Sequence, residues 1–113
     1  MHELSLACNI LELTEEAVKA NNAKTVIELV LDVGVFSGVE ITALETAIES
    51  IKPETVLDKS KIIINIIEGK AICRHCHHEF VPENIFSPCP DCNNYGLDVI
   101  AGDELKVRTI IAE

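Results

Sequence analysis

The sequence predicts a mixed α+β fold, in which a small β-sheet flanked by two helices carries an inserted, zinc-ribbon-like module with four cysteines. Three observations support this prediction. Two segments space their apolar residues as amphipathic helices do, other segments alternate apolar and polar residues as strands do, and two Cys-x-x-Cys pairs follow each other in the second half of the chain. With 113 residues, the chain is long enough for one ordinary domain with a small insert.

Helical spacing occurs in two stretches. The first covers about residues 4–21, and the second covers about residues 40–52 and ends at Pro53, which cannot continue a helix. We expect the first helix to bury a stripe made of Leu4, Cys8, Leu11 and Val18. Within this stripe, Cys8 is expected to be a small buried side chain rather than a reactive thiol.

Strand patterns lie between and after the helices. Residues 24–34 alternate apolar and polar side chains, which predicts a strand with one buried face. Residues 61–68 contain five isoleucines, and this β-branched run predicts a strand with both faces largely covered. Residues 97–100 and 103–111 alternate again and are expected to form a closing strand or a hairpin.

The order of these elements predicts a discontinuous domain. Residues 1–69 together with 98–113 are expected to form the α/β part of the protein. Residues 70–97 are expected to form the metal-binding module, which is anchored to the sheet at both of its ends.

The most informative pattern is the pair of Cys-x-x-Cys motifs, which are separated by twelve residues. Four thiolates at this spacing can occupy the corners of a tetrahedron around Zn²⁺, and the ligands would be Cys73, Cys76, Cys89 and Cys92. Because residues 70–97 contain few large apolar side chains, bound metal would contribute folding free energy, on the order of 10 kcal/mol. Two disulfides, a redox pair or a four-thiolate iron site remain as alternatives. A closed four-cysteine site is structural and leaves no open position for hydrolysis.

The composition restricts the partners and the compartment. Nineteen acidic and nine basic residues give a net charge of −10, and four thiolates around one divalent ion would make it −12. This charge argues against nucleic acid or an anionic membrane surface as a partner and favours metal cations and basic protein surfaces. The chain has neither a secretion-signal pattern nor an apolar run of about twenty residues, so we expect a cytoplasmic protein.

His2 could form a second metal site at the N-terminus. An imidazole one peptide bond from a free α-amine can chelate a metal through the amine, the intervening amide nitrogen and the ring. Nitrogen ligands in one plane suit Ni²⁺ or Cu²⁺. The residues alone favour the alternative, an exposed terminal histidine without a role.

Several short motifs occur in a fixed order along the chain. They are Met1-His2-Glu3-Leu4-Ser5-Leu6-Ala7, Ser37-Gly38-Val39-Glu40, the two cysteine pairs with Phe80 and Pro88-Cys89-Pro90, and Gly102-Asp103-Glu104-Leu105-Lys106-Val107. In this combination the chain resembles the HypA/HybF family of hydrogenase maturation proteins over essentially its whole length. The most specific element is a Met-His-Glu start combined with an internal four-cysteine site.

The resemblance implies a non-enzymatic metallochaperone that delivers nickel for assembly of the [NiFe] hydrogenase active site. It implies that His2 binds nickel together with the Met1 amine and the backbone amides of His2 and Glu3, with Glu3 as an additional contact. The four cysteines would then hold a structural zinc ion. The implied partners are the GTPase HypB and the hydrogenase large subunit, with urease accessory proteins as a further option. The protein itself would be a monomer or a weak homodimer.

Two features leave alternatives open. His75, His77 and His78 make the first cysteine motif richer in histidine than in many family members, and we expect these residues to be solvated loop residues, although they could tune the zinc site. The competing function is a zinc-ribbon protein–protein interaction module without a nickel role. A redox protein is a weaker alternative, and a zinc hydrolase is disfavoured because the sequence contains no HExxH-like motif.

Overall fold

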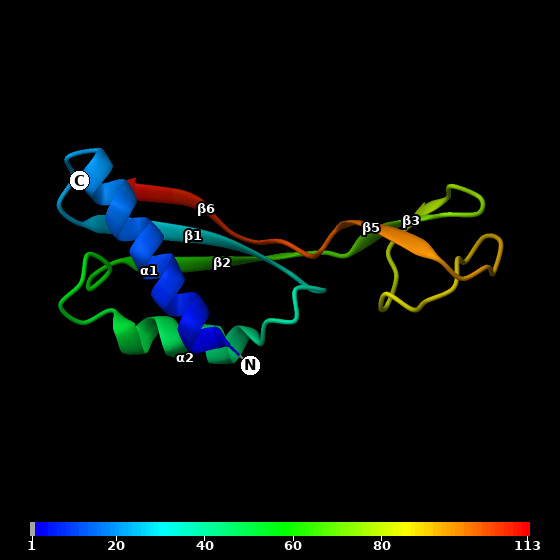
Figure 1. The fold of residues 1–113 in the computed structure, drawn as a ribbon, viewed down its shortest axis with the longest axis horizontal. Coiled ribbons are helices and arrows are strands. Elements are labelled where there is room, and N and C mark those ends of the chain that lie inside the picture. Colours follow the sequence, from blue (N-terminus) through cyan, green and yellow to red (C-terminus); the bar gives the residue numbers. More distant parts are fainter. Residues whose placement is uncertain (1) are drawn as a thin grey trace. The chain divides into compact units, whose positions relative to one another are not determined.

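The structure of the protein, a computed structural model, describes residues 2–113 and contains two helices and six strands in this part of the chain. Their order is α1 (Glu3–Ala20), β1 (Val26–Gly34), α2 (Ile41–Ile51), β2 (Lys61–Ile67), β3 (Lys70–Cys73), β4 (Glu79–Phe80), β5 (Leu97–Ala101) and β6 (Leu105–Ala112) (Figure 1). The α+β fold class with a four-cysteine cluster is therefore confirmed. None of the helices in residues 2–113 has the length and apolar character needed to span a bilayer.

The chain forms two compact units. The first contains the chain through Leu31, then Val39–Ile64 and Val107–Glu113, and the second contains Asp32–Gly38 and Asn65–Lys106. The second unit is larger than the module over residues 70–97 that the sequence suggests. Whether either part folds as an independent domain stays a prediction.

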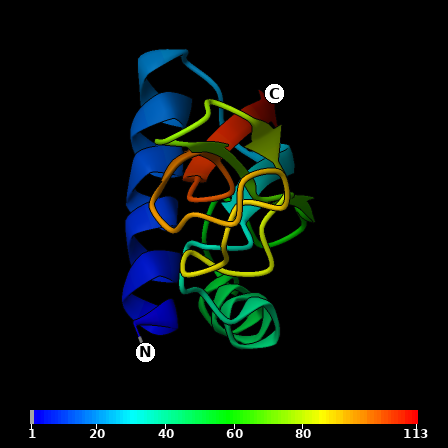
Figure 2. The same ribbon diagram turned by 90° about the vertical axis from the view of Figure 1, so that its right-hand side faces the viewer.

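In the first unit, α1 packs against α2, and the N-terminal ends of the two helices lie side by side (Figure 2). The stripe that α1 buries differs from the expected one. Leu4 is 58% exposed and Cys8 is exposed, whereas the buried residues are Glu3, Ala7, Ile10, Thr14 and Val18. Apolar residues occur on more than one face of this helix, so periodicity alone selects the wrong stripe. The small residue Ala7 allows close approach, and the Thr14 hydroxyl is satisfied by the Ile10 carbonyl at 2.7 Å.

One sheet has the strand order β2-β1-β6. Thr25 and Glu113 exchange backbone hydrogen bonds, and the Gly34 amide donates to the Glu104 carbonyl at 2.7 Å, so β6 runs antiparallel to β1. The central strand β1 supplies much of the core, because Leu29, Leu31 and Val33 are at most 1% exposed.

The expectation that β2 is covered on both faces is wrong. The strand lies at the edge of the sheet, none of its residues is fully buried, and Ile66 is 61% exposed. The isoleucine run predicted a strand correctly because β-branched side chains favour extended backbone. It could not show that β1 would occupy the central position.

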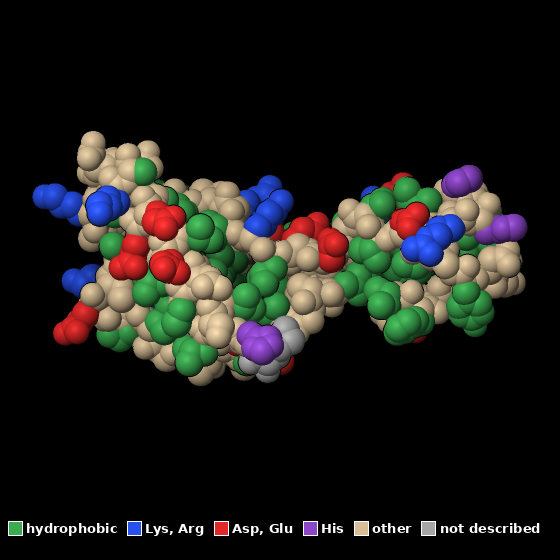
Figure 3. Space-filling view, viewed as in Figure 1, with side chains coloured by type: hydrophobic (Ala, Val, Ile, Leu, Met, Phe, Trp, Pro, Cys, Tyr) green, Lys and Arg blue, Asp and Glu red, His purple; other side chains and the backbone are tan. Residues whose placement is uncertain are grey.

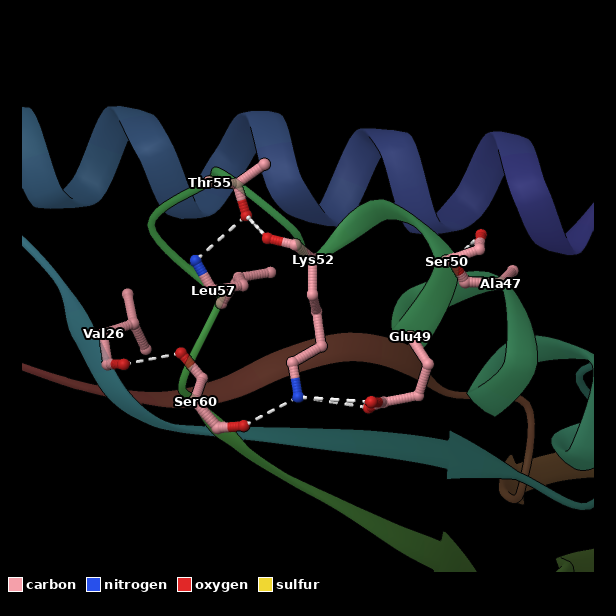
Figure 4. A network of polar contacts seen from close by, with 8 residues as sticks. All are labelled: Val26, Ala47, Glu49, Ser50, Lys52, Thr55, Leu57 and Ser60. Carbon is pink, nitrogen blue, oxygen red and sulfur yellow. Dashed lines mark hydrogen bonds and ion pairs between the residues drawn. The ribbon is translucent and has the colours of Figure 1, made fainter.

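The connection between α2 and β2 is more ordered than its polar sequence suggests. Leu57 in this connection is fully buried, and the Ser60 hydroxyl donates to the Val26 carbonyl at 2.5 Å. The Lys52 ammonium donates to the Ser60 carbonyl at 3.0 Å and pairs with Glu49 at 3.2 Å (Figure 4). These contacts hold the start of β2 beside β1.

Two glycines in the second unit allow close backbone contact. A Cβ atom added to Gly34 would lie 2.0 Å from the Gly102 carbonyl oxygen, so no larger residue fits there. Gly102 has a φ angle of +103°, a conformation that L side chains rarely adopt. The chain can therefore place these two segments in direct contact only because both residues are glycine.

A second sheet, within the second unit, has the strand order β4-β3-β5, and both pairings are antiparallel. Ala71 pairs with Phe80 on one side and with Val99 on the other. Of the two options expected for residues 97–100 and 103–111, the hairpin is therefore excluded, and the closing strand is present as β6. Strand β5 pairs with β3, which leads into the cysteines, and β6 joins the other sheet.

We predict that Leu57→Ala lowers the free energy of unfolding by about 2–5 kcal/mol, because truncating a fully buried leucine leaves a cavity. Urea denaturation followed by circular dichroism measures this change. The matched control is Lys59→Ala, two residues away and exposed, which should change stability by less than about 0.5 kcal/mol. Equal effects of the two substitutions would contradict the central role of Leu57.

Candidate functional site

The four cysteines of the second unit lie on two turns with the same backbone pattern. In the first turn, the Cys73 amide donates to the His78 carbonyl and the His77 amide donates to the Cys73 carbonyl, both at 2.9 Å. In the second turn, the Cys89 amide donates to the Asn94 carbonyl at 3.0 Å and the Asn93 amide donates to the Cys89 carbonyl at 2.8 Å. The fourth residue after each leading cysteine has a positive φ angle, 64° at His77 and 59° at Asn93.

These turns bring the four sulfur atoms together. All four Sγ atoms lie within 4.8 Å of one another, with 3.7 Å between Cys73 and Cys92 and 3.6 Å between Cys76 and Cys89. Four sulfurs bound tetrahedrally to Zn²⁺ at about 2.3 Å would be about 3.8 Å apart. The cysteine cluster, meaning Cys73, Cys76, Cys89 and Cys92, therefore has the size of a four-thiolate metal site. All five cysteines are free thiols, so the disulfide alternative is absent from residues 2–113.

Hydrogen bonds to sulfur favour thiolates in this cluster. The His75 amide donates to the Cys73 Sγ, and the Asp91 amide donates to the Cys89 Sγ, both at 3.4 Å. The pKa of Cys92 is lowered to about 6, chiefly by a hydrogen bond from the Asn94 backbone amide and next by one from the Asn94 side-chain amide, which lies 3.4 Å from the sulfur. Such donors stabilise the charged form of the ligand.

The neighbouring thiols oppose full ionisation. A backbone hydrogen bond from His78 lowers the pKa of Cys76, but burial and the other three thiols outweigh it and raise this pKa to about 12. Negative charges this close repel one another, so the cluster needs a cation before it can hold four thiolates. The donor set thus fits a thiophilic divalent ion.

The three histidines near the first cysteine pair do not belong to the cysteine cluster. His75, His77 and His78 are exposed, and among residues 2–113 the group that could hold a metal contains cysteines alone. The His78 ring stacks on Phe80 with a centroid distance of 6.2 Å. This arrangement matches the expectation of solvated loop residues.

The N-terminal residues singled out by the sequence lie at the start of α1. Met1 falls outside the described residues. His2 is exposed and occupies the N-cap position, where its carbonyl accepts a hydrogen bond from the Leu6 amide at 2.9 Å. The first backbone N–H groups of a helix have no acceptor within the helix. The amides of His2 and Glu3 are in this position at the start of α1.

Glu3 has a structural contact that the sequence did not reveal. Its side chain is only 6% exposed, and its Oε2 atom accepts a hydrogen bond from the Glu40 amide at 3.2 Å. The Glu40 carboxylate in turn caps α2, accepting from the Thr42 amide at 3.2 Å and the Ala43 amide at 2.6 Å. Glu3 thus connects the start of α1 to the start of α2. The sequence offered only a weak signal for Glu40: the helix dipole favours acidic residues near a helix start, but glutamate is not among the preferred N-cap residues.

The pKa of Glu3 is lowered from its ordinary value of 4.5. The main cause is the hydrogen bond from the Glu40 backbone amide, and the Glu3 backbone amide also contributes. The positive end of the α2 dipole favours a carboxylate in this position as well. The charged form of Glu3 is therefore part of the folded structure.

A two-helix α+β fold with a cysteine cluster sized for a metal ion is the architecture of a small metal-binding protein. The chain belongs to the HypA family, because the family model described as hydrogenase/urease nickel incorporation, metallochaperone, hypA matches residues 1–112. The descriptions of this family and its relatives are nickel metallochaperone and hydrogenase maturation factor.

Individual relatives agree with this assignment. The hydrogenase maturation factor HypA of Parabacteroides distasonis is 43% identical over 111 residues, which cover 98% of this chain and 96% of the relative. The protein of the same name from Rhizobium leguminosarum is 39% identical over 108 residues, or 96% of each chain.

Solved structures share the fold. The solution structure of the Ni metallochaperone HypA from Helicobacter pylori has a TM-score of 0.71 and is 24% identical, covering 99% of this chain and 97% of that one. A second solution structure, of a HypA protein, has a TM-score of 0.75 at 23% identity, with coverage of 100% and 97%.

We predict that Glu3→Gln destabilises the protein at neutral pH. A carboxylate with a lowered folded-state pKa contributes stability above its ordinary pKa of 4.5, and this contribution disappears as the pH falls through the lowered value. The difference from the wild type should therefore shrink as the pH falls from 7 to 3. Urea denaturation at each pH measures it.

The control for this prediction is Glu12→Gln, an identical substitution on the exposed face of α1. It should produce little change at any pH. A deficit in Glu3→Gln that stayed constant with pH would show that the charge of Glu3 is irrelevant.

Proposed function

We propose that this protein carries Ni²⁺ for assembly of the [NiFe] hydrogenase active site, with nickel at the N-terminus and a structural zinc ion in the cysteine cluster. The nickel ligands in this proposal are the Met1 amine, the backbone amides of His2 and Glu3, and the His2 imidazole. Membership of a nickel metallochaperone family supports the cargo. The conclusion for this chain depends on the residues at the start of α1.

The observation that carries the nickel site is the position of His2. Because α1 begins at Glu3, the amides of His2 and Glu3 have no helical acceptor, so binding a metal through them would break no helical hydrogen bond. Nickel would displace the hydrogen bond that the Glu3 amide makes to its own carboxylate. The imidazole is exposed and has no hydrogen bond to another described residue. Nitrogen ligands at this spacing suit the tetragonal geometry of Ni²⁺.

Glu3 has a positioning role in this proposal. Its carboxylate accepts a hydrogen bond from the Glu40 amide, so it holds the start of α1 next to the exposed His2 imidazole. The additional contact of Glu3 with nickel that the resemblance implies would have to compete with this hydrogen bond. An exposed chelate also suits transfer, because a partner can replace its ligands one at a time.

The cysteine cluster is proposed to bind zinc rather than nickel. Thiolates at tetrahedral spacing are typical ligands of structural zinc, which supplies folding free energy and no redox chemistry. The residues around the ligands orient them through N–H···S hydrogen bonds. The preference of zinc for the thiolates and of nickel for the nitrogen ligands would thus direct the two metals to different sites.

The remaining parts of the proposal follow from the family's role in hydrogenase maturation. The partners are the GTPase HypB and the hydrogenase large subunit, and the protein acts in the cytoplasm without catalysing a reaction. The family description also includes urease, so urease accessory proteins are further candidates.

We predict that the zinc-loaded protein with its native N-terminus binds one equivalent of Ni²⁺. Acetylating the Met1 amine should weaken this binding by a factor of ten or more, because a blocked amine can no longer coordinate the metal. Isothermal titration calorimetry measures both forms, and His2→Ala should also lose the site. Binding should weaken as the pH falls, since metal and protons compete for the same nitrogens.

Equal nickel binding by the native and acetylated proteins would contradict this assignment. Nickel would then lie at the histidines near Cys76 or elsewhere on the surface. No binding to either form would favour an interaction module without a nickel role.

We predict that Cys92→Ser loses the single zinc equivalent and disorders the second unit. The amide signals of residues 70–97 should lose dispersion in NMR spectra, while those of α1 and α2 persist. The matched control is Cys8→Ser, which changes an exposed thiol outside the cysteine cluster and should retain full zinc content. Retention of zinc by Cys92→Ser at wild-type affinity would contradict the four-ligand site.

A further inference from the structure

A groove runs along the outer side of β5, within the second unit. It has a volume of about 590 Å³ and is lined by Arg74, Ile85, Phe86, Tyr95, Gly96, Leu97, Asp98 and Val99. The aromatic residues of this groove are open to solvent, because Phe86 is 77% exposed and Tyr95 is 74% exposed. Hydrophobic side chains are visible on the surface of this unit in Figure 3. Large apolar side chains grouped on a surface often mark an interaction site.

The backbone of β5 along this groove can accept another strand. In the order β4-β3-β5, the outer side of β5 has no partner strand in residues 2–113. Arg74 and Gly96 form a hydrogen-bonded pair, since the Arg74 amide donates to the Gly96 carbonyl at 3.1 Å. Hydrogen-bonded and non-hydrogen-bonded pairs alternate along an antiparallel ladder. Counting from Gly96, Leu97 and Val99 therefore belong to non-hydrogen-bonded pairs with β3, and their N–H and C=O groups point away from β3. Both residues line the groove.

The charges around the groove restrict what can bind there. Between Asn65 and Lys106 the chain has seven acidic and three basic residues, so this part of the second unit is negative before any thiolate is counted. Two of the three cations are engaged in ion pairs, Lys70 with Glu79 at 2.9 Å and Arg74 with Asp98 at 2.8 Å. Asp98 itself lines the groove, and exposed Glu83 lies two residues before Ile85.

We propose that β5 and its groove bind an extended segment of a partner protein in which apolar residues alternate with lysine or arginine. The segment adds a strand to the outer side of β5 through the backbone groups of Leu97 and Val99. Its apolar side chains fill the groove beside Phe86 and Tyr95. Its basic side chains meet the net negative charge of this part of the second unit and compete with Arg74 for Asp98. Strand addition obtains affinity from main-chain hydrogen bonds and specificity from side-chain pockets.

The same observations argue against a second copy of this chain as the occupant. Two molecules with a net charge of −10 repel each other, and each would bring acidic residues to the shared edge. The groove contains none of the proposed nickel ligands. Its function is therefore independent of the nickel site, and either proposal can fail without the other.

The test uses the full chain and a synthetic peptide, acetyl-Lys-Leu-Arg-Val-Lys-Leu-Arg-amide, followed by ¹H–¹⁵N NMR without nickel. We expect saturable shifts of the amide signals of Tyr95, Leu97 and Val99. Phe86→Ser should weaken binding about tenfold, as expected for an aromatic anchor. The matched control is Val81→Ser, which changes a side chain that is 55% exposed in the same unit but outside the groove. This control should bind as the wild type does.

Two peptide variants separate the parts of the proposal. A version with glutamate in place of each lysine and arginine should not bind, and a version N-methylated at alternate residues should lose the strand hydrogen bonds and bind much more weakly. Equal binding of either variant overturns the proposal. It is also overturned by an absence of shifts at millimolar peptide, by shifts located on another surface, or by self-association through β5 without peptide.

Discussion

The convergence of four sulfur atoms is the constraint on which the second unit depends. Within residues 70–97, the buried hydrophobic residues are Ala71, Cys73, Cys89 and Leu97, so half of this small core consists of cysteines. A segment with so little apolar volume cannot supply its own folding free energy, and a cation bound by the cluster would supply the stabilisation that a larger core provides elsewhere. Strands β3 and β5 lead into and out of the cysteine turns, so their pairing also depends on these sulfurs.

A different kind of contact organises the N-terminal end of the first unit. Glu3 and Glu40 place two carboxylates at the start of α2, where one accepts from the Glu40 amide and the other from the amides that follow. Acidic side chains are stabilised at this end of a helix. The contact orders the residues next to His2 and leaves the imidazole exposed. In the proposed nickel site, this arrangement would combine an ordered backbone with a ligand that a partner can reach.

Sequence patterns predicted the helices and strands themselves more reliably than the surfaces and strands against which they pack. The first helix was expected at 4–21 and lies at Glu3–Ala20, and the isoleucine run is a strand, as its β-branched residues indicate. The buried stripe of α1, the edge position of β2 and the pairing of β5 were all expected otherwise. Each of these depends on which surface meets the element, and local periodicity contains no information about that surface.

The sequence by itself determined the family, the α+β class and the four cysteines as a metal-binding set, because motif spacing and residue chemistry are local properties. Only the tertiary structure decided that Glu3 contacts Glu40, thirty-seven residues away, and that Leu57 in a polar connection is fully buried. It also decided that Phe86, Tyr95 and β5 share one groove. Contacts between distant residues arise from packing, which minimises exposed apolar surface over the whole chain rather than within any one segment.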